Sequence, residues 1–463
     1  MSIRLAVYHA PFDPPTLHHR RIAERLVDLF DRVVVVPSGP RPKPSGVPES
    51  LPIHRATMSD LHFRGLEERG LSVDLSDLED NCHSPPACLT DRYLAEGVEF
   101  WHVISADWVR GGAAKQSTIH TDWERGPQQW DAVGFIVLRE RGEPVDPADL
   151  PPKHVVIEHG AYVPSQTVRM MLNQGEDAAT AHLQPSVASY IRRHGLYRDV
   201  PAEERATFKP DHPKFKLYVD EWKETSRNIG ELLAPYTGDH PEMIVAVGGD
   251  GTMLRAIRKH WRERLPFYGI NTGGLGFLLS GRDVTTFWRE ELLLYHLPLL
   301  LVEVEFVSGG KQQAVAFNEA WVERATGQTA WVRVSVNGQE RMKKLVGDGV
   351  LVSTAAGSTS YARAMGAPPV PLNTGVLLLV GSNVLRPAFW RPAVLPMSAD
   401  VIFEAIDPSK RPLQGYCDGE LFPEPVKRMK VRVSRTAAVE LAFTRGHDPF
   451  AKLAQVQFPV DND

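Results

Sequence analysis

The feature that most limits how this chain can fold is an apolar segment that runs directly into glycines. Residues 243–247 are all apolar, residues 248–252 read Gly-Gly-Asp-Gly-Thr, and the pattern of a helix follows over 253–257. We expect a buried strand, a tight turn and a helix in succession, as in α/β folds. Glycines let successive backbone N–H groups converge on a phosphate, and a helix N-terminus adds a favourable field.

Asp250 stands inside this turn, where a carboxylate would repel a phosphate unless it has a chemical role. It could hold a metal ion or accept the proton of an attacking hydroxyl. The alternative is a plain glycine turn in which the aspartate caps the helix. The segment lacks the Gly-Lys-Ser/Thr ending of a Walker A loop and the third glycine of a dinucleotide-binding fingerprint, so it belongs to neither class.

Three further segments of the second half place polar groups where predicted strands end. They are residues 271–278, the pair Asn318-Glu319, and residues 347–361, which close in a loop of small and hydroxyl-bearing residues. Together with the glycine turn, they closely resemble the NAD kinase family over about residues 213–430. The resemblance implies phosphoryl transfer from ATP or polyphosphate to the adenosine ribose 2′-hydroxyl of NAD, giving NADP, with Mg²⁺ on the donor phosphates.

The same resemblance implies roles for residues at matching positions. Asp250 would be the general base, or the acid that organises the metal, for the attacking hydroxyl. The residues of the turn that would bind phosphates are Gly248, Gly249, Gly251 and Thr252. Further residues would bind the dinucleotide: Phe277 would pack on the adenosine, and Asn318 and Glu319 would bind its ribose and phosphate end. The rest of the dinucleotide pocket would be formed by Asp348, Thr359, Ser360 and Tyr361. Gly274 stands where many relatives carry histidine, so any polar contact from that side chain is lost.

The first 200 residues alternate apolar strands with amphipathic helices. We predict strands near 5–7, 32–36, 101–105, 133–138 and 154–157, and helices over 18–30, 165–172 and 185–194, with Ser165 as an N-cap. Such alternation predicts a layered α/β fold with a right-handed first crossover.

Histidines and hydroxyl-bearing residues stand where these strands end and helices begin. Residues 8–19 read Tyr-His-Ala-Pro-Phe-Asp-Pro-Pro-Thr-Leu-His-His, and residues 163–169 read Val-Pro-Ser-Gln-Thr-Val-Arg. A histidine at a helix N-terminus can donate to a triphosphate, although it is also common at a solvated helix start. The order and spacing resemble nicotinate/nicotinamide mononucleotide adenylyltransferases over about residues 1–198. That family implies a Rossmann-like domain that joins a mononucleotide to the AMP part of ATP and releases pyrophosphate.

This second resemblance also implies site residues. His19 would be the catalytic histidine and would contact the ATP phosphates together with Thr16. The triphosphate would be bound by Ser165, Thr167 and Arg169. Another phosphate would be bound by Lys43 and Arg55, and a ribose or Mg²⁺ by Asp107. The sequence departs from the family just before Phe-Asp-Pro, where His9, Ala10 and Pro11 stand in place of the usual glycines. It also departs at His18, where a glycine usually lets the nucleotide approach the backbone.

We therefore predict an α/β protein with a nucleotidyltransferase-like domain at 1–198, a linker at 199–213 and a kinase domain at 214–463. The kinase domain would comprise an α/β part to about 292, a β-rich part over 293–430 and a C-terminal return segment. Two consecutive reactions favour nicotinamide mononucleotide (NMN) as the first substrate, with nicotinate mononucleotide left open. The alternatives are a kinase whose first domain is degenerate and serves regulation or oligomerisation, and another adenylyl- or cytidylyltransferase.

Charge and cysteine content narrow the class of protein. The net charge is −5, and residues 1–200 hold 21 basic and 27 acidic residues, so a nucleic-acid binder is not expected. No export leader or membrane span is apparent, which favours a cytoplasmic enzyme. Cys82, His83 and Cys88 could hint at a metal, but no second ligand pair has zinc spacing, so we expect only Mg²⁺ carried by ATP. The kinase family also implies a homo-oligomer.

Overall fold

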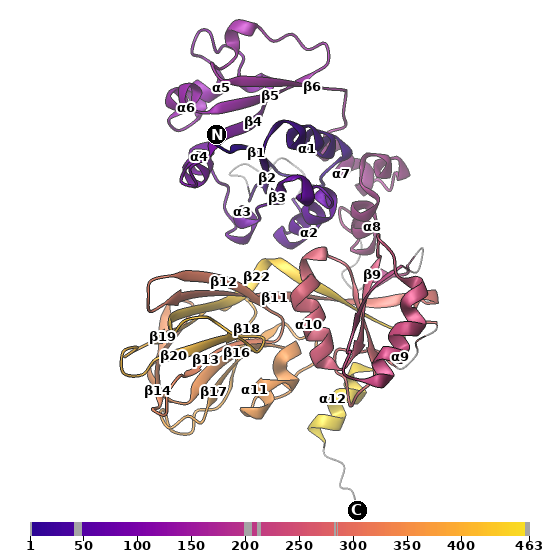
Figure 1. The fold of residues 1–463 in the computed structure, drawn as a ribbon, viewed down its shortest axis with the longest axis vertical. Coiled ribbons are helices and arrows are strands. Elements are labelled where there is room, and N and C mark those ends of the chain that lie inside the picture. Colours follow the sequence, from indigo (N-terminus) through magenta and orange to yellow (C-terminus); the bar gives the residue numbers. More distant parts are fainter. Residues whose placement is uncertain are drawn as a thin grey trace, which may run out of the picture. The chain divides into compact units, whose positions relative to one another are not determined.

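The computed structural model describes residues 2–40, 49–198, 206–210, 214–281, 284 and 286–458. The chain divides into two compact units, Met1–Glu204 and Arg205–Asp463 (Figure 1). Most of the predicted linker, residues 199–205 and 211–213, lies outside the described residues. The remainder is not simply a linker, because strand β7 (Thr207–Phe208) pairs with β11 (Leu292–Phe306) of the second unit.

The first unit is built on a six-stranded sheet in the order β3-β2-β1-β4-β5-β6. All of its pairings are parallel. The strands are β1 (Arg4–Ala10), β2 (Arg32–Pro37), β3 (Leu71–Val73), β4 (Glu99–Ser105), β5 (Gly134–Glu140) and β6 (His154–His159). This order is that of doubly wound α/β sheets, in which ligands bind at the carboxyl ends of the strands where the order reverses.

Helices cover both faces of this sheet because alternate strand residues point to opposite sides. Ala6 and Tyr8 pack in one core with α1 and α2, and Leu5 and Val7 pack in another with α4, α5 and α6. The helices are α1 (Leu17–Leu29), α2 (Pro52–Phe63), α3 (Ser76–Glu79), α4 (Pro86–Leu94), α5 (Thr118–Asp122), α6 (Gly126–Ala132), α7 (Ser165–Asn173) and α8 (Pro185–Arg193).

The second unit begins with a parallel sheet of buried strands. The strands β8 (Phe215–Val219), β9 (Met243–Gly248) and β10 (Phe267–Asn271) pair in parallel, and β22 (Val426–Phe443) adds to β10. Helices α9 (Glu224–Leu233) and α10 (Asp250–His260) follow β8 and β9. The apolar run 243–247 is thus a central strand, as its composition predicts.

The remaining strands of the second unit form the predicted β-rich part, with antiparallel pairings throughout. They are β11, β12 (Lys311–Ala316), β13 (Glu319–Arg324), β14 (Ala330–Val336), β15 (Gln339–Gly347), β16 (Gly349–Thr354), β17 (Val376–Ser382), β18 (Ala393–Pro396), β19 (Val401–Ala405), β20 (Leu413–Cys417) and β21 (Glu420–Leu421). The long strands β11 and β22 pair side by side and link both parts, and the short helices α11 (Tyr361–Ala364) and α12 (Pro449–Gln457) complete the unit (Figure 1). Across the described part of the chain, none of the helices has the length and apolar character needed to cross a membrane.

Candidate active sites

The glycine turn of the second unit joins the end of β9 to the start of α10. Gly248 ends the strand, Gly249 is the N-cap, and Asp250 is the first helical residue. A Cβ atom on Gly248 would lie 2.3 Å from the hydroxyl oxygen of Thr252, whereas one on Gly249 would meet no described atom within 4 Å. Gly248 is therefore required for close packing, and Gly249 leaves the space beside the helix N-terminus open.

Asp250 connects this turn to the loop after β10. Its Oδ2 accepts a hydrogen bond from the N–H of Phe277, and its Oδ1 accepts one from the N–H of Leu278, both at 2.9 Å. Each carboxylate oxygen keeps a further lone pair, so the group can still accept a proton from a substrate hydroxyl. The carboxylate thus positions the Phe277 segment and remains a candidate base.

Lys452 of the C-terminal helix α12 belongs to the same cluster, although no sequence pattern marks it. Its Nζ donates to the carbonyl oxygens of Gly276 and Leu279, both at 2.6 Å. Burial lowers the pKa of Lys452, and the nearby Asp250 carboxylate opposes that shift. The return segment therefore brings a cation to the loop that Asp250 holds.

A second cluster forms where β13 begins. Asn318 and Glu319 are both buried, and the side-chain atoms Asn318 Oδ1 and Glu319 Oε2 make no hydrogen bond to any described residue. Ser360 Oγ donates to Glu319 Oε1 at 3.3 Å. Burial, followed by repulsion from Asp418, raises the pKa of Glu319 to about 8, although the Ser360 hydrogen bond acts to lower it. Two buried polar atoms are thus available to ligand hydroxyls, which can both donate and accept hydrogen bonds.

Asp418 holds the backbone of this second cluster and was missed by the sequence analysis. Its carboxylate accepts three backbone hydrogen bonds, from Phe317, Asn318 and Glu319, at 2.6, 2.8 and 3.0 Å. Burial raises the pKa of Asp418 despite these hydrogen bonds. The available signal was Asp418-Gly419 between two short strands, a typical hairpin turn.

The two clusters share one hydrophobic core. Phe317 and Ala356 pack in the same core as Met253 of α10 and Leu278 of the Asp250-bound loop. An ion pair of 2.6 Å also joins Arg258 of α10 to Glu420, beyond Asp418. Asp250 and Glu319 are therefore supported by one packed unit.

Not every predicted kinase residue joins these clusters. Asp348 lies at the far end of β13 from Glu319 and pairs with Arg324 at 2.7 Å. Tyr361 is 38% exposed, with its ring 5.2 Å from that of Trp321. The other predicted residues lie in the turn, its bound loop and the segment after β16: Gly251, Thr252, Phe277 and Thr359. At Gly274 a Cβ would meet no described atom within 4 Å, so the position stays open.

Comparison with known proteins identifies the family. Residues 176–282 match the family model described as the ATP-NAD kinase N-terminal domain. The chain is 34% identical over 250 residues to the NAD kinase of Rickettsia bellii, which covers 53% of this chain and 98% of that protein. The chain belongs to the NAD kinase family.

Other relatives of this NAD kinase family member align over a similar length. The NAD kinase of Rickettsia africae is 36% identical over 222 residues, 48% of this chain and 87% of that one. A solved NAD kinase from Archaeoglobus fulgidus in complex with ATP shows 22% identity and a TM-score of 0.41, covering 52% of this chain and 97% of that one. About half of this chain lies outside these alignments.

In the first unit, the start of α1 differs from the glycine turn of the second unit because side chains surround it. The N–H of Thr16 donates to Nδ1 of His19 at 2.9 Å, and the Thr16 hydroxyl lies 3.0 Å from the same nitrogen. Burial, with a smaller contribution from His18, lowers the pKa of His19 to about 3. The ring is therefore neutral near pH 7, and because Nδ1 accepts a hydrogen bond its proton lies on Nε2.

A pocket of about 340 Å³ lies beside this helix start, lined by residues that include Thr16, His18, Arg21 and Tyr162. The His18 ring stacks on Tyr162, with centroids 4.0 Å apart and an angle of 8°. Burial, followed by His159 and Arg21, lowers the pKa of His18 to about 4. The imidazole that replaces the expected glycine therefore forms a neutral, aromatic wall of the pocket.

The predicted cations of the first unit are largely engaged by the protein itself. Arg55 is buried and donates to the carbonyl oxygens of Pro11 and Ser38 and to Glu49. Arg169 is buried and donates to the backbone oxygen of Asp13. Both guanidinium groups tie the 11–13 segment to neighbouring elements, an arrangement that the spacing of charges did not reveal.

The other predicted residues of the first unit lie in varied positions. Ser165 is not the N-cap of α7 but its first residue, and its hydroxyl donates to the carbonyl oxygen of Pro14 at 2.9 Å. Thr167 is exposed, and Asp107 is an exposed residue after β4 that pairs with Arg110 at 3.2 Å. Lys43 lies outside the described residues.

Proposed function

We propose that the second unit phosphorylates NAD at the adenosine ribose 2′-hydroxyl, with MgATP as donor. One observation carries this proposal, the placement of Asp250 at the N-terminus of α10 beside an unfilled glycine position. Backbone N–H groups and a helix N-terminus favour the donor phosphates, and the carboxylate provides an acceptor for the substrate proton. Membership of the NAD kinase family supports the same chemistry.

In the proposed reaction, the ribose oxygen attacks the γ-phosphorus of ATP in line. The new P–O bond forms as the bond between the γ-phosphorus and the β–γ bridging oxygen breaks, and ADP leaves. The hydroxyl proton moves to the Asp250 carboxylate. Mg²⁺ bound to ATP would neutralise charge on the donor phosphates.

The two buried polar side chains at the start of β13 would recognise the acceptor nucleotide. Asn318 Oδ1 and Glu319 Oε2 have hydrogen-bonding capacity that no described residue uses. Ribose hydroxyls both donate and accept hydrogen bonds, so they match the Asn318 oxygen and the neutral Glu319 carboxyl. A site built for them discriminates against analogues that lack them. Phe277, held by the Asp250 hydrogen bond, would pack against the adenosine.

We further propose that the first unit is an adenylyltransferase that supplies the kinase with NAD. Support comes from the doubly wound strand order and from His19, whose Nε2–H lies at the N-terminus of α1. The mononucleotide phosphate would attack the α-phosphorus of ATP, and pyrophosphate would leave. No protein nucleophile is needed, because the step depends on orientation and charge stabilisation. NMN is the favoured substrate, since its product enters the second reaction directly.

One observation favours a second candidate, a first unit without catalytic activity. Arg55 and Arg169, the two predicted cations that the structure describes, are both buried and bound to protein acceptors, so neither is poised to bind a triphosphate. Such a unit would serve regulation or oligomerisation instead.

One chromatographic experiment separates these possibilities. The purified chain is incubated with MgATP and NMN, nicotinate mononucleotide or NAD, and the products are resolved. NADP from NMN is the expected result and requires both reactions. NADP from NAD alone would contradict adenylyl transfer to NMN, and the nicotinate lane would then report whether the first unit is inactive. No NADP in any lane would overturn the kinase proposal.

A further inference from the structure

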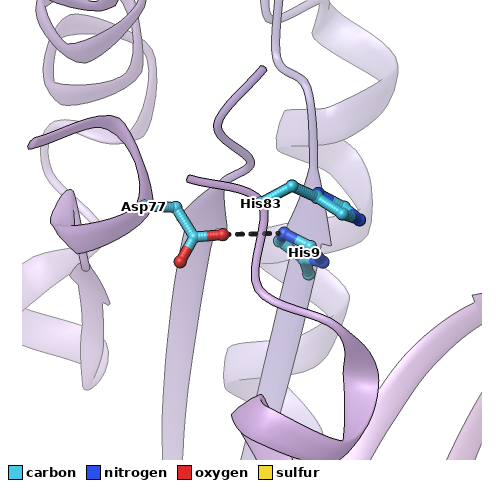
Figure 2. Close-up of side chains that lie close together, drawn as sticks. All are labelled: His9, Asp77 and His83. Carbon is cyan, nitrogen blue, oxygen red and sulfur yellow. Dashed lines mark ion pairs between the residues drawn. The ribbon is translucent and has the colours of Figure 1, made fainter. Parts of the chain in front are cut away.

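Three side chains with metal-binding atoms meet in the first unit, and none of them lines the pocket described above. They are His9, Asp77 and His83, shown in Figure 2, and their ligand atoms all lie within 4.8 Å of one another. Of the three residues that the sequence marks as possible ligands, only His83 belongs to this cluster. The structure pairs it with His9 and Asp77 rather than with Cys82 and Cys88, which are free thiols.

The fold brings these residues together from two parts of the chain, the end of β1 and the segment that comprises α3 and the loop after it. His9 lies near the carboxyl end of β1 and points to the same face as Val7, away from α1. Asp77 belongs to α3, after β3, and His83 lies in the loop that follows α3. The two imidazole rings stack with centroids 5.1 Å apart, and His9 Nε2 lies 3.3 Å from Asp77 Oδ2.

The carboxylate of Asp77 is fixed in position by its neighbours. Ser84 donates to it twice, from its backbone N–H to Oδ2 at 2.9 Å and from its hydroxyl to Oδ1 at 2.6 Å. Arg92 lies 3.6 Å away but approaches Oδ1, whereas His9 approaches Oδ2. Arg92 is also held by Asp74 at 3.3 Å. The competing cation is therefore on the far side of the carboxylate, and hydrogen bonds orient the ligand as outer partners do in metal sites.

We propose that His9, Asp77 and His83 bind a divalent transition-metal ion through two imidazole nitrogens and one carboxylate oxygen. This ligand set is used by Zn²⁺ and by Fe²⁺, with open positions left for water or another ligand. Bonds of about 2.1 Å place tetrahedral ligand atoms about 3.4 Å apart, so ligand atoms that lie within 4.8 Å of one another need to draw together by at most about 1.4 Å. The site does not rest on either proposed activity.

The alternative is that the cluster is an ion pair between His9 and Asp77, with His83 stacked on it and no metal. The test uses the full chain after treatment with EDTA and dialysis, without nucleotide. Zn²⁺ binding is measured by titration calorimetry, and Co²⁺ binding by its visible absorption. We expect tight binding that His83→Gln and His9→Gln each weaken by about 100-fold or more, because each removes one of three ligands.

The matched control is His154→Gln, which removes an exposed histidine of the same unit outside the cluster. Zn²⁺ should raise the melting temperature of the wild type and of this control but not of His83→Gln. Circular dichroism without metal checks that each variant folds. His83 lies in a loop, so His83→Gln still tests the site if His9→Gln does not fold. Equal Zn²⁺ affinity in the wild type and His83→Gln, or no tight site in the wild type, would overturn the proposal.

Discussion

The two units place a candidate phosphate site at the same point of an α/β layer, yet fill it with opposite kinds of residue. In the second unit, β9 ends in glycines and the helix start is left open at Gly249. In the first unit, β1 is followed by a segment that leads to His18 and His19, which belong to the first turn of α1 and whose rings contact each other. One site exposes backbone donors, and the other surrounds a helix start with aromatic side chains.

This difference teaches how each unit can recognise a phosphate. A glycine turn lets the phosphate approach the backbone N–H groups, so recognition needs little from side chains. In the histidine-containing segment, the hydrogen bond from Thr16 fixes the His19 ring and leaves the ring proton on Nε2. The activity of the second unit should therefore be sensitive to a carbon atom added in the glycine turn. The activity of the first unit should be sensitive to the loss of the His19 ring.

The largest expected effect is that of Asp250→Asn in the second unit. The amide cannot act as a base, and it can accept only one of the two backbone hydrogen bonds that the carboxylate accepts. We expect kcat for NADP formation from NAD to fall by roughly 10²–10⁴-fold. Steady-state kinetics measure this change, and NAD formation from NMN is the internal control. Activity close to that of the wild type would exclude Asp250 as the base.

The second prediction concerns His19→Ala in the first unit. Loss of the Nε2–H donor should lower the rate of NAD formation from NMN by roughly 10²-fold, with the kinase reaction unchanged. Because the pKa of His19 is held at about 3, the wild-type rate should also show no loss from protonation of this ring down to about pH 5. If NAD synthesis is present and survives the substitution, the proposed site in the first unit is wrong.

The sequence predicts the buried strand and turn of the second unit well, because short-range pattern determines both. Glycines after an apolar strand require the turn, and β9 followed by α10 forms as expected. The sequence does not predict that the Asp418 carboxylate accepts hydrogen bonds from the backbone of Asn318 and Glu319, because about 100 residues separate Asp418 from this pair along the chain. Nor could charge spacing show that Arg55 and Arg169 are used internally, since only tertiary packing determines which acceptors surround a cation.

The third prediction separates packing from ligand access within the glycine turn. A methyl group at Gly248 would collide with Thr252, so Gly248→Ala should destabilise the chain by about 1–3 kcal/mol. Gly249→Ala has room and should leave the melting temperature unchanged, yet raise the KM for ATP by about 10-fold by blocking close approach. Differential scanning calorimetry and kinetics measure the two effects. Equal loss of stability in both variants would show that the turn is only structural.

The last prediction compares protonation in the two units. Burial keeps His19 neutral by lowering its pKa, and it keeps Glu319 neutral by raising its pKa to about 8. The ordinary pKa of a glutamate is 4.5, and that of Glu319 is raised in the folded state. Such a group contributes its full stabilisation of the folded state at pH values below 4.5. This stability is lost as the pH rises toward 8, by at most about 1.4 kcal/mol per pH unit, and the loss levels off above it. Glu319→Gln removes the titrating group while keeping its shape. The melting temperature of the wild type should therefore fall relative to that of the variant between pH 5 and 8, and parallel curves would mean that Glu319 is ionised and already paired in the folded protein.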